Sequence, residues 1–301
     1  MAGLQIVIPG ADFSGSGIPR NTRYLPGTDI PAYDALGVWA LSEGTAGSVY
    51  TGEFANLVPG GPSARLLPGW AAPTMRNFGT QRGGFSVESV DGTFIDTRVS
   101  AARSAFTMAG ILRTRPKHGT VTPYNLIQML TSDDMNNLPA SNAGNISMLT
   151  GLWSLGSNLN DGQVGQLVKF GAAIANVDGS SSTIMPAFYG QQNQWNAVGI
   201  SIDGHSGEMV LQTLTARGVV TDAGRGNTLL HQRFVTELAQ RGGNFLFGAM
   251  PNGGARDSSG PIADFMCAGV WGNSKTEGEM EAILRGLAKI AIGRGVTVSG
   301  Y

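Results

Sequence analysis

The chain has 301 residues, of which 42% are hydrophobic, only 14% are charged and 45 are glycine, and its formal net charge is −1. This composition excludes a generally disordered chain, because enough apolar surface is present for a core, and it gives no sign of nucleic-acid binding, because lysine and arginine form no cluster. Low charge with many glycines is typical of short strands joined by tight turns.

The first ten residues have neither the basic start nor the long apolar run of a secretory signal peptide. No apolar stretch reaches the roughly eighteen residues that a membrane-spanning helix needs. The single cysteine, Cys267, cannot form an internal disulfide. We therefore expect a protein that is made and folded in the cytoplasm and does not insert into a membrane.

Residues 1–34 differ from the rest of the chain. A short apolar strand, Leu4–Ile8, is followed by a stretch rich in glycine and proline, which favours an extended backbone over a helix. Two interpretations stay open for this N-terminal arm. It is either an edge strand with a loop over the domain's own surface, or an extension that docks onto a neighbouring subunit.

From Ala35 onward, short apolar runs alternate with turns, which predicts many short strands and an all-β sandwich or barrel. The clearest hairpin joins Trp195–Ile202 to Glu208–Leu214 through an Asp-Gly turn at residues 203–204. The other expected strands are Leu36–Leu41, Phe106–Leu112, Leu126–Leu130, Ile146–Trp153, Val164–Ala173, Phe245–Ala249 and Ile262–Trp271.

One C-terminal helix is expected after residue 273. Ser274 and Glu277 have the spacing of a capping box, and Gly293 and Gly295 are suited to ending the helix. Apolar residues recur between these points at steps of three and four, which predicts one buried face. They are Met280, Ile283, Leu284, Leu287, Ile290 and Ala291.

The last expected elements follow one another in a distinctive order. The Trp195 hairpin is followed by Phe245–Gly248, by Ile262–Trp271 and by a helix opening at Thr276–Met280. This order resembles that in the concanavalin A-like, laminin-G-like jelly-roll superfamily, which is found in bacteriophage tail and fibre proteins. A weaker similarity covers residues 35–112, in Leu57–Leu66 and Phe94–Asp96. The resemblance implies a two-sheet antiparallel jelly roll over residues 35–301, with residues 113–190 either in the sandwich or forming an inserted lobe.

Catalytic chemistry is not expected. A glycan hydrolase needs two carboxylates that face the same site, and the Glu-x-Asp-x-x-Glu strand that resemblance to the superfamily's enzymes would imply is absent. Glu88 and Asp91 have odd spacing, which places them on opposite faces of a strand. No cofactor is implied, apart from one candidate calcium site. Its oxygen ligands would come from the loop residues Asp133, Asp134, Asn136 and Asn137, which otherwise form a polar turn.

Exposed aromatic residues are the second lead, because sugars stack on tryptophan and tyrosine rings. Four tryptophans lie in apolar strands and are expected in the core, namely Trp39, Trp153, Trp195 and Trp271. Trp70 and Tyr189 lie beside loops. The predicted contact patch for a glycan or a neighbouring subunit combines Tyr189, Gln191, Gln192 and Asn193, with Trp70 as a further candidate.

The resemblance and the missing signal peptide predict a non-catalytic bacteriophage virion protein, in a tail, fibre or decoration, made in the bacterial host cytoplasm. Its expected partners are further copies of itself, preferably as a trimer, other virion proteins and cell-surface glycan. A stand-alone carbohydrate-binding protein is the alternative, with a glycan-active enzyme behind it.

Overall fold

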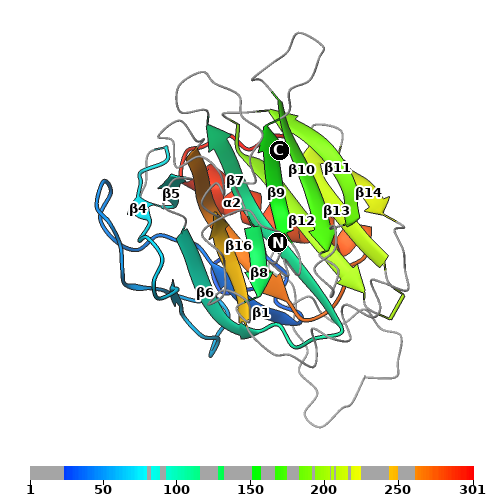
Figure 1. Ribbon diagram of the computed structural model, residues 1–301, viewed down its shortest axis with the longest axis horizontal. Helices are drawn as coiled ribbons and strands as arrows, with labels where there is room; N and C mark the ends of the chain where they lie inside the picture. The colour runs from blue at the N-terminus through cyan, green and yellow to red at the C-terminus, as the bar shows by residue number, and fades with distance from the viewer. Residues whose placement is uncertain are drawn as a thin grey trace, which may run out of the picture.

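Antiparallel strands and one C-terminal helix make up most of the described chain, as Figure 1 shows for the computed structural model. The structure describes residues 24–79, 83–88, 93–115, 128–131, 151–156, 167–174, 183–191, 194–203, 205–206, 208–215, 218–224, 244–249 and 262–301. Within these ranges, no helix combines the length and the apolar character that crossing a membrane requires.

The larger sheet has eight strands in the order β14–β13–β12–β7–β16–β5–β4, and β1 also pairs with β16. The strands β12 and β13 form the predicted hairpin, with Asp203 opposite Glu208. The bounds are β1 (Ala35–Trp39), β4 (Thr74–Met75), β5 (Phe85–Glu88), β7 (Ala105–Arg115), β12 (Asn196–Asp203), β13 (Glu208–Thr215), β14 (Gly218–Gly224) and β16 (Ile262–Trp271).

A five-stranded sheet has the order β2–β3–β6–β15–β8, and a three-stranded sheet has the order β11–β10–β9. Because β9 lies beside β8, and β11 beside β13 and β14, the small sheet bridges the edges of the two larger ones. The bounds are β2 (Glu53–Phe54), β3 (Ala64–Leu66), β6 (Thr93–Ser100), β8 (Gln128–Thr131), β9 (Gly151–Gly156), β10 (Leu167–Ile174), β11 (Thr183–Gln191) and β15 (Asn244–Ala249).

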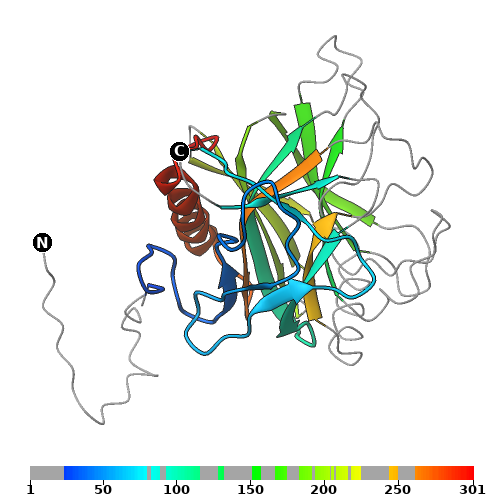
Figure 2. The ribbon, with the colours of Figure 1, turned by 90° about the vertical axis from the view of Figure 1, so that its left-hand side faces the viewer.

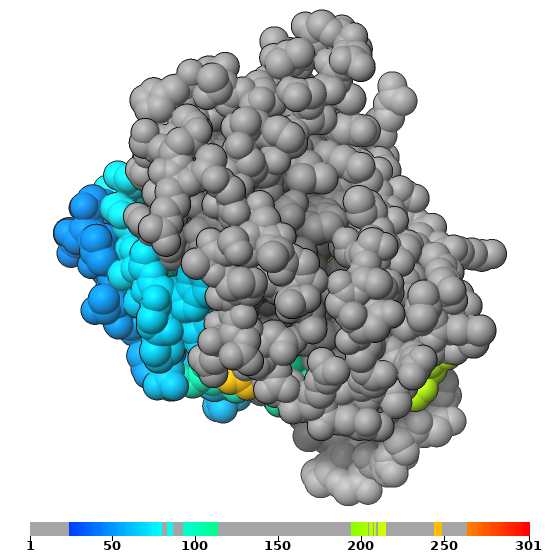
Figure 3. Space-filling model, viewed as in Figure 1, coloured from blue at the N-terminus to red at the C-terminus, as the bar shows by residue number. Residues whose placement is uncertain are grey.

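All pairs of these strands are antiparallel. Side chains of the eight-stranded and the five-stranded sheet share one buried core, so the all-β sandwich with a C-terminal helix is confirmed. Within residues 113–190, β8 belongs to the five-stranded sheet, whereas β9 and β10 belong to the small sheet. Short strands and loops of the N-terminal part, blue and cyan in Figure 3, form one edge of the face shown there.

The central strands are buried on both faces, which explains why their sequences are almost continuously apolar. In β7, Phe106 and Met108 point into the core between the two larger sheets, and Ala109 and Ile111 point to the opposite face, toward the helix. Three tryptophans expected in the core are confirmed there: Trp39 and Trp271 are 0% exposed and Trp195 is 4% exposed. The side chain of the fourth, at position 153, falls outside the described part.

Helix α2 (Glu277–Gly293) covers the outer face of the eight-stranded sheet, as Figure 2 shows in red. Gly199 allows the close approach, because a Cβ atom there would lie 2.5 Å from the sulfur of Met280. Gly295, with φ 81°, follows the helix end as predicted. The buried helix residues are Met280, Ile283, Leu284, Gly286, Leu287, Ala288 and Ala291.

The capping box lies two residues later than the sequence pattern at Ser274–Glu277 predicts. Thr276 is the N-cap residue, and its side chain exchanges hydrogen bonds with Glu279. The backbone N–H of Lys275 instead donates to Oγ of Ser201, at 2.7 Å. This tertiary hydrogen bond on the sheet holds the residues before the helix in place, so the second of two possible capping sequences is used.

Candidate functional site

Residues 24–34 lie against helix α2, as the blue segment beside the red helix shows in Figure 2. Leu25 and Ile30 are 1% and 0% exposed and pack into the apolar layer under the helix. This part of the segment assigned to the N-terminal arm thus runs over the domain's own surface, as in the first of the two interpretations. Residues 1–23 fall outside the described residues, so an arm that reaches a neighbour stays a prediction.

A tight turn and a helix glycine fix the course of this segment. The hydroxyl of Thr28 donates to the carbonyl of Leu25 at 3.0 Å and accepts the N–H of Ile30 at 3.1 Å. Gly286 provides the space in the helix, because a Cβ atom there would lie 2.8 Å from Cγ1 of Ile30 and 3.0 Å from the carbonyl oxygen of Asp29. The segment therefore crosses α2 at one defined point.

Two aspartate–lysine pairs connect the segment to the end of the sheet and to the helix. In the inner pair, Lys275 contacts Asp34, and their side chains are 4% and 12% exposed. The outer pair, Lys289 and Asp29, has side chains that are 50% and 57% exposed. The inner pair also receives a hydrogen bond from Nδ2 of Asn273 to Oδ2 of Asp34, at 2.9 Å.

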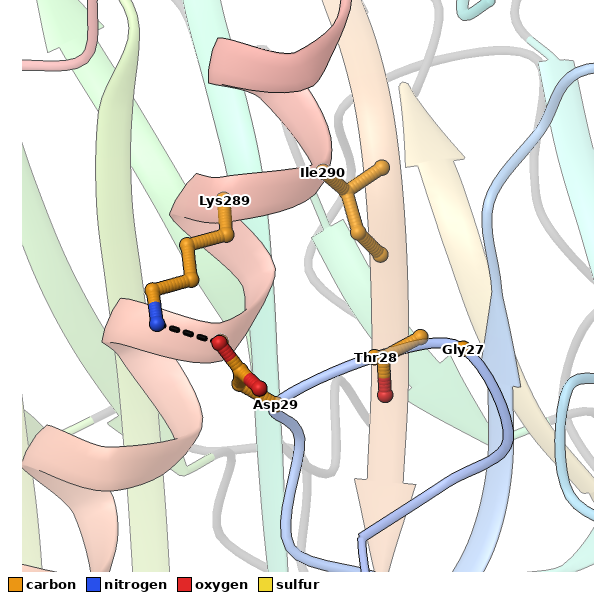
Figure 4. A pocket seen from close by; sticks show the side chains of 6 residues that line it. Gly27, Thr28, Asp29, Lys289 and Ile290 are labelled. Atoms are coloured by element: carbon orange, nitrogen blue, oxygen red, sulfur yellow. Dashed lines mark hydrogen bonds and ion pairs between the residues drawn. The ribbon is translucent and has the colours of Figure 1, made fainter. Parts of the chain in front are cut away.

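The outer pair lies in an open depression that we call the polar groove, with a volume of about 280 Å³. Figure 4 shows Asp29 on the loop and Lys289 on the helix pointing toward each other. Both ionic side chains are accessible to a bound molecule because both are half exposed. The groove is lined by Gly27, Thr28, Asp29, Gly286, Lys289 and Ile290.

Two exposed aromatic side chains lie near the polar groove. Tyr24 is 53% exposed and Tyr301 is 49% exposed. The pKa of Lys289 is raised first by its hydrogen bond with Asp29 and, to a smaller extent, by the charges of Asp29, Tyr301 and Tyr24. Tyr24 is joined to this segment by a backbone bridge with Pro31, and neither tyrosine is among the side chains that line the groove.

A second depression, which we call the apolar hollow, lies on the other side of the crossing point and has a volume of about 380 Å³. The ring of Tyr33, a residue 45% exposed, forms part of its wall, with Nζ of Lys275 5.3 Å from the ring centroid. The indole N–H of Trp271 donates to the carbonyl of Pro31 at 3.3 Å. The other lining residues are Gly278, Glu279, Ala282 and Ile283.

The buried ionisable groups of the eight-stranded sheet have internal partners. Asp264, 0% exposed, accepts hydrogen bonds from Oγ of Ser86 at 2.6 Å and Nε of Arg113 at 2.8 Å. The Arg113 guanidinium in turn lies 4.6 Å from the ring centroid of Trp195. Burial raises the pKa of Cys267 to about 12, which keeps the thiol protonated at neutral pH. These contacts are structural.

Of the residues predicted from the sequence as site residues, only Trp70 has a described side chain, and it lines neither depression. Trp70 is half-buried and packs edge-on against Phe94, with the ring centroids 4.8 Å apart. Tyr189 and Gln191 lie in strand β11, of which the structure describes only the backbone. Gln192 and Asn193 lie outside the described residues, so that contact patch stays a prediction.

The candidate calcium ligands Asp133, Asp134, Asn136 and Asn137 also fall outside the described residues. In the part of the chain that is described, no three acidic, histidine or cysteine side chains are grouped to hold a metal ion. The calcium site therefore stays a prediction as well.

None of the residues of the polar groove is predicted from the sequence as a site residue, and Ile290, predicted for the buried face of the helix, is only partly buried and lines the groove. Pro26-Gly27 correctly indicates a turn, and Asp29 follows it, but the loop's position against the helix comes from tertiary packing. Lys289 lies at the border of the apolar face of the predicted helix, where a long charged side chain can reach the solvent along the domain surface. This position is the one signal for Lys289 in the sequence.

No protein-family model and no curated protein matches this sequence. Among solved structures, HCR/D-Sa-GBL1/C has a TM-score of 0.50 and 10% identity, over 84% of this chain and 52% of that chain. The receptor-binding domain of botulinum neurotoxin C/D mosaic serotype has a TM-score of 0.47 and 8% identity, over 84% and 51% of the two chains. The botulinum neurotoxin DC binding domain in complex with SialylT has a TM-score of 0.49 and 10% identity, over 84% of this chain and 51% of that chain.

The chain thus spans about half the length of these structures. At 10% identity, the likeness to HCR/D-Sa-GBL1/C shows a shared fold alone. It agrees with the antiparallel β-sandwich that the resemblance of the sequence implies. Function therefore has to be argued from this chain's own surface.

Proposed function

We propose that this protein binds a glycan, without catalysis, in the polar groove between residues 27–29 and helix α2. The observation that carries the proposal is the exposed pair of Asp29 and Lys289 in the polar groove, with the exposed ring of Tyr24 on the same segment as Asp29. A carboxylate accepts hydrogen bonds from sugar hydroxyls, and an ammonium group donates to sugar oxygens. Tyrosine rings add a large contact surface at small entropic cost.

The openness of the groove also favours a sugar over a buried substrate. The ionic pair is accessible to solvent and screened by it. A ligand can therefore replace the hydrogen bonds that the two side chains make to water at a small cost in free energy. The non-catalytic part of the proposal rests on the sequence, which lacks the Glu-x-Asp-x-x-Glu strand of the superfamily's enzymes.

A glycan array tests this proposal. We expect the wild-type protein to bind a defined group of glycans and the Tyr24→Ala and Tyr301→Ala variants to lose about tenfold in affinity for them, because each loses a ring contact. Val49→Ala is the matched control, since Val49 is 64% exposed and does not line either depression. Equal binding by all four proteins would contradict the proposal.

We also propose that the protein serves assembly of a bacteriophage virion as a homo-oligomer, preferably a trimer. Its support is the resemblance of the sequence to bacteriophage tail and fibre proteins. Light scattering tests this role: a closed oligomer supports it, and a monomer at all concentrations contradicts it.

A further inference from the structure

We propose that the polar groove selects neutral over acidic sugars, and that Asp29 is the residue that determines this specificity. The inference rests on the glycan binding proposed above and adds the class of glycan. Three features of the groove support it: the pairing of its ionic side chains, the hydrogen bonds of its turn and its position on helix α2.

The first feature is that the cation of the groove already has an anionic partner. The ammonium group of Lys289 donates a hydrogen bond to the carboxylate of Asp29, as Figure 4 shows. An acidic sugar that approaches the ammonium group also meets the negative charge beside it, so repulsion offsets the attraction. A neutral sugar can instead donate a hydroxyl to Asp29 and accept a hydrogen bond from Lys289 while the pair stays intact.

The neighbouring charges on the helix do not change this balance. Arg285 lies one turn before Lys289 on the same face of α2. Its guanidinium group lies 2.7 Å from the carboxylate of Glu281, so this second pair is also neutral as a unit. The two pairs together contribute no net positive charge to the groove.

The second feature is that amide groups of the turn beside the groove are used inside the turn. Anion sites are commonly built from backbone N–H groups that point at the ligand. Here the N–H of Thr28 donates to the carbonyl of Leu25 at 3.0 Å, and the N–H of Ile30 donates to Oγ1 of Thr28 at 3.1 Å. These two donors are therefore not available to the carboxylate or sulfate group of an acidic sugar.

The third feature is the position of the groove on α2. Its helix residues, Gly286, Lys289 and Ile290, belong to the second half of the helix, and Ile290 lies in the last turn before the end at Gly293. The last carbonyl groups of a helix carry partial negative charge, which disfavours an anion. The half-buried Ile290 adds aliphatic surface, against which the C–H face of a neutral sugar ring can pack.

A matched set of glycans tests the inference. Each neutral gluco-, galacto- and manno-oligosaccharide on an array is compared with two analogues, in which a carboxylate or an uncharged carboxamide replaces the terminal C6 hydroxymethyl group. For the glycans that bind, we expect the carboxylate to bind about fivefold more weakly, because it can neither donate to Asp29 nor avoid its charge. The carboxamide, which has nearly the same shape, should lose less than about twofold.

Asp29→Asn supplies the decisive variant, and Glu281→Gln the matched control. Each change replaces one partly exposed carboxylate of an ion pair by its amide, and only Asp29 lines the groove. Because Asp29→Asn leaves Lys289 without its anionic partner, we expect the affinity for the carboxylate analogues, relative to the neutral glycans, to rise about tenfold. Glu281→Gln should keep the ratio of the wild type, and thermal melts show whether both variants are folded.

The outcomes separate this inference from the proposed glycan binding. If the carboxylate analogues bind at least as tightly as the neutral glycans, or if the carboxamides lose as much affinity as the carboxylates, the selection by charge is overturned and glycan binding stands. An unchanged ratio in Asp29→Asn, or an equal rise in Glu281→Gln, overturns the assignment of Asp29 in the same way. Absence of binding by every glycan overturns both proposals.

Discussion

The two aspartate–lysine pairs that join residues 24–34 to the domain have the same chemistry and opposite surroundings. Lys275 and Asp34 are almost fully buried beside the sheet end, whereas Lys289 and Asp29 are half exposed on the helix. A buried charge that loses its partner is costly, so we expect the loss of one partner of the inner pair to destabilise the fold. The exposed pair contributes little to folding because solvent screens it, which leaves it available to a ligand.

The largest expected effect comes from breaking the inner pair. Lys275→Met leaves Asp34 without its cation in a nearly buried position, and we expect the free energy of unfolding to fall by about 3 kcal/mol. Urea denaturation measures this change. Arg285→Met is the control, because Arg285 forms an exposed pair with Glu281 on the same helix and its loss should cost less than about 0.5 kcal/mol. Equal losses in the two variants would remove the distinction between buried and exposed pairs.

An intermediate effect is expected where the segment crosses the helix. Gly286→Ala forces a methyl group against Ile30, and we expect a loss of about 1.5 kcal/mol in the free energy of unfolding. Gly278→Ala is the matched control, since its methyl group meets no neighbour and should instead stabilise the helix by about 0.5–1 kcal/mol. Stabilisation by both variants would mean that the crossing is not tightly packed.

Most of the fold could be predicted from the sequence because local signals and packing agree there. The Asp-Gly turn predicts the β12–β13 hairpin, and the apolar residues from Met280 to Ala291 predict the buried face of α2. The capping box was predicted two residues early, because a hydrogen bond to Ser201 from a distant strand chooses between two equivalent patterns.

The candidate site could not be predicted in the same way. Residues 24 and 29 on one side and 289 and 301 on the other are more than 250 positions apart, and the contact between them depends on Ile30 fitting against Gly286. Neither Ile30 nor Gly286 carries a local sequence signal for this contact. The aromatic residue that the sequence did single out among the described ones, Trp70, packs instead on Phe94.

The smallest expected effect concerns pH and the helix N-terminus. Burial alone would raise the pKa of Glu279, but hydrogen bonds from Thr276 and the charge of Lys275 outweigh it and hold the pKa below the usual value of 4.5. A carboxyl whose pKa is lowered by folding stabilises the protein above its unfolded pKa, and this stability is lost as the pH falls through the folded value.

Glu279→Gln therefore should cost about 0.5 kcal/mol at neutral pH, and the difference from wild type should shrink as the pH falls below about 4.5. Thermal melts of the two proteins across this range measure it. Glu277→Gln, also in the first turn but outside the capping pair, is the control. A difference that does not change with pH would contradict the assigned role of the Glu279 carboxylate.

The most direct test of the central claim compares Lys289→Gln with Arg285→Gln on the same glycan array, with thermal melts of both. Each variant removes one exposed cation from helix α2, but only Lys289 lines the polar groove. We predict nearly unchanged melting for both and at least a tenfold loss of glycan binding for Lys289→Gln alone. Equal glycan binding by the two variants would contradict the assignment of the groove as the binding site.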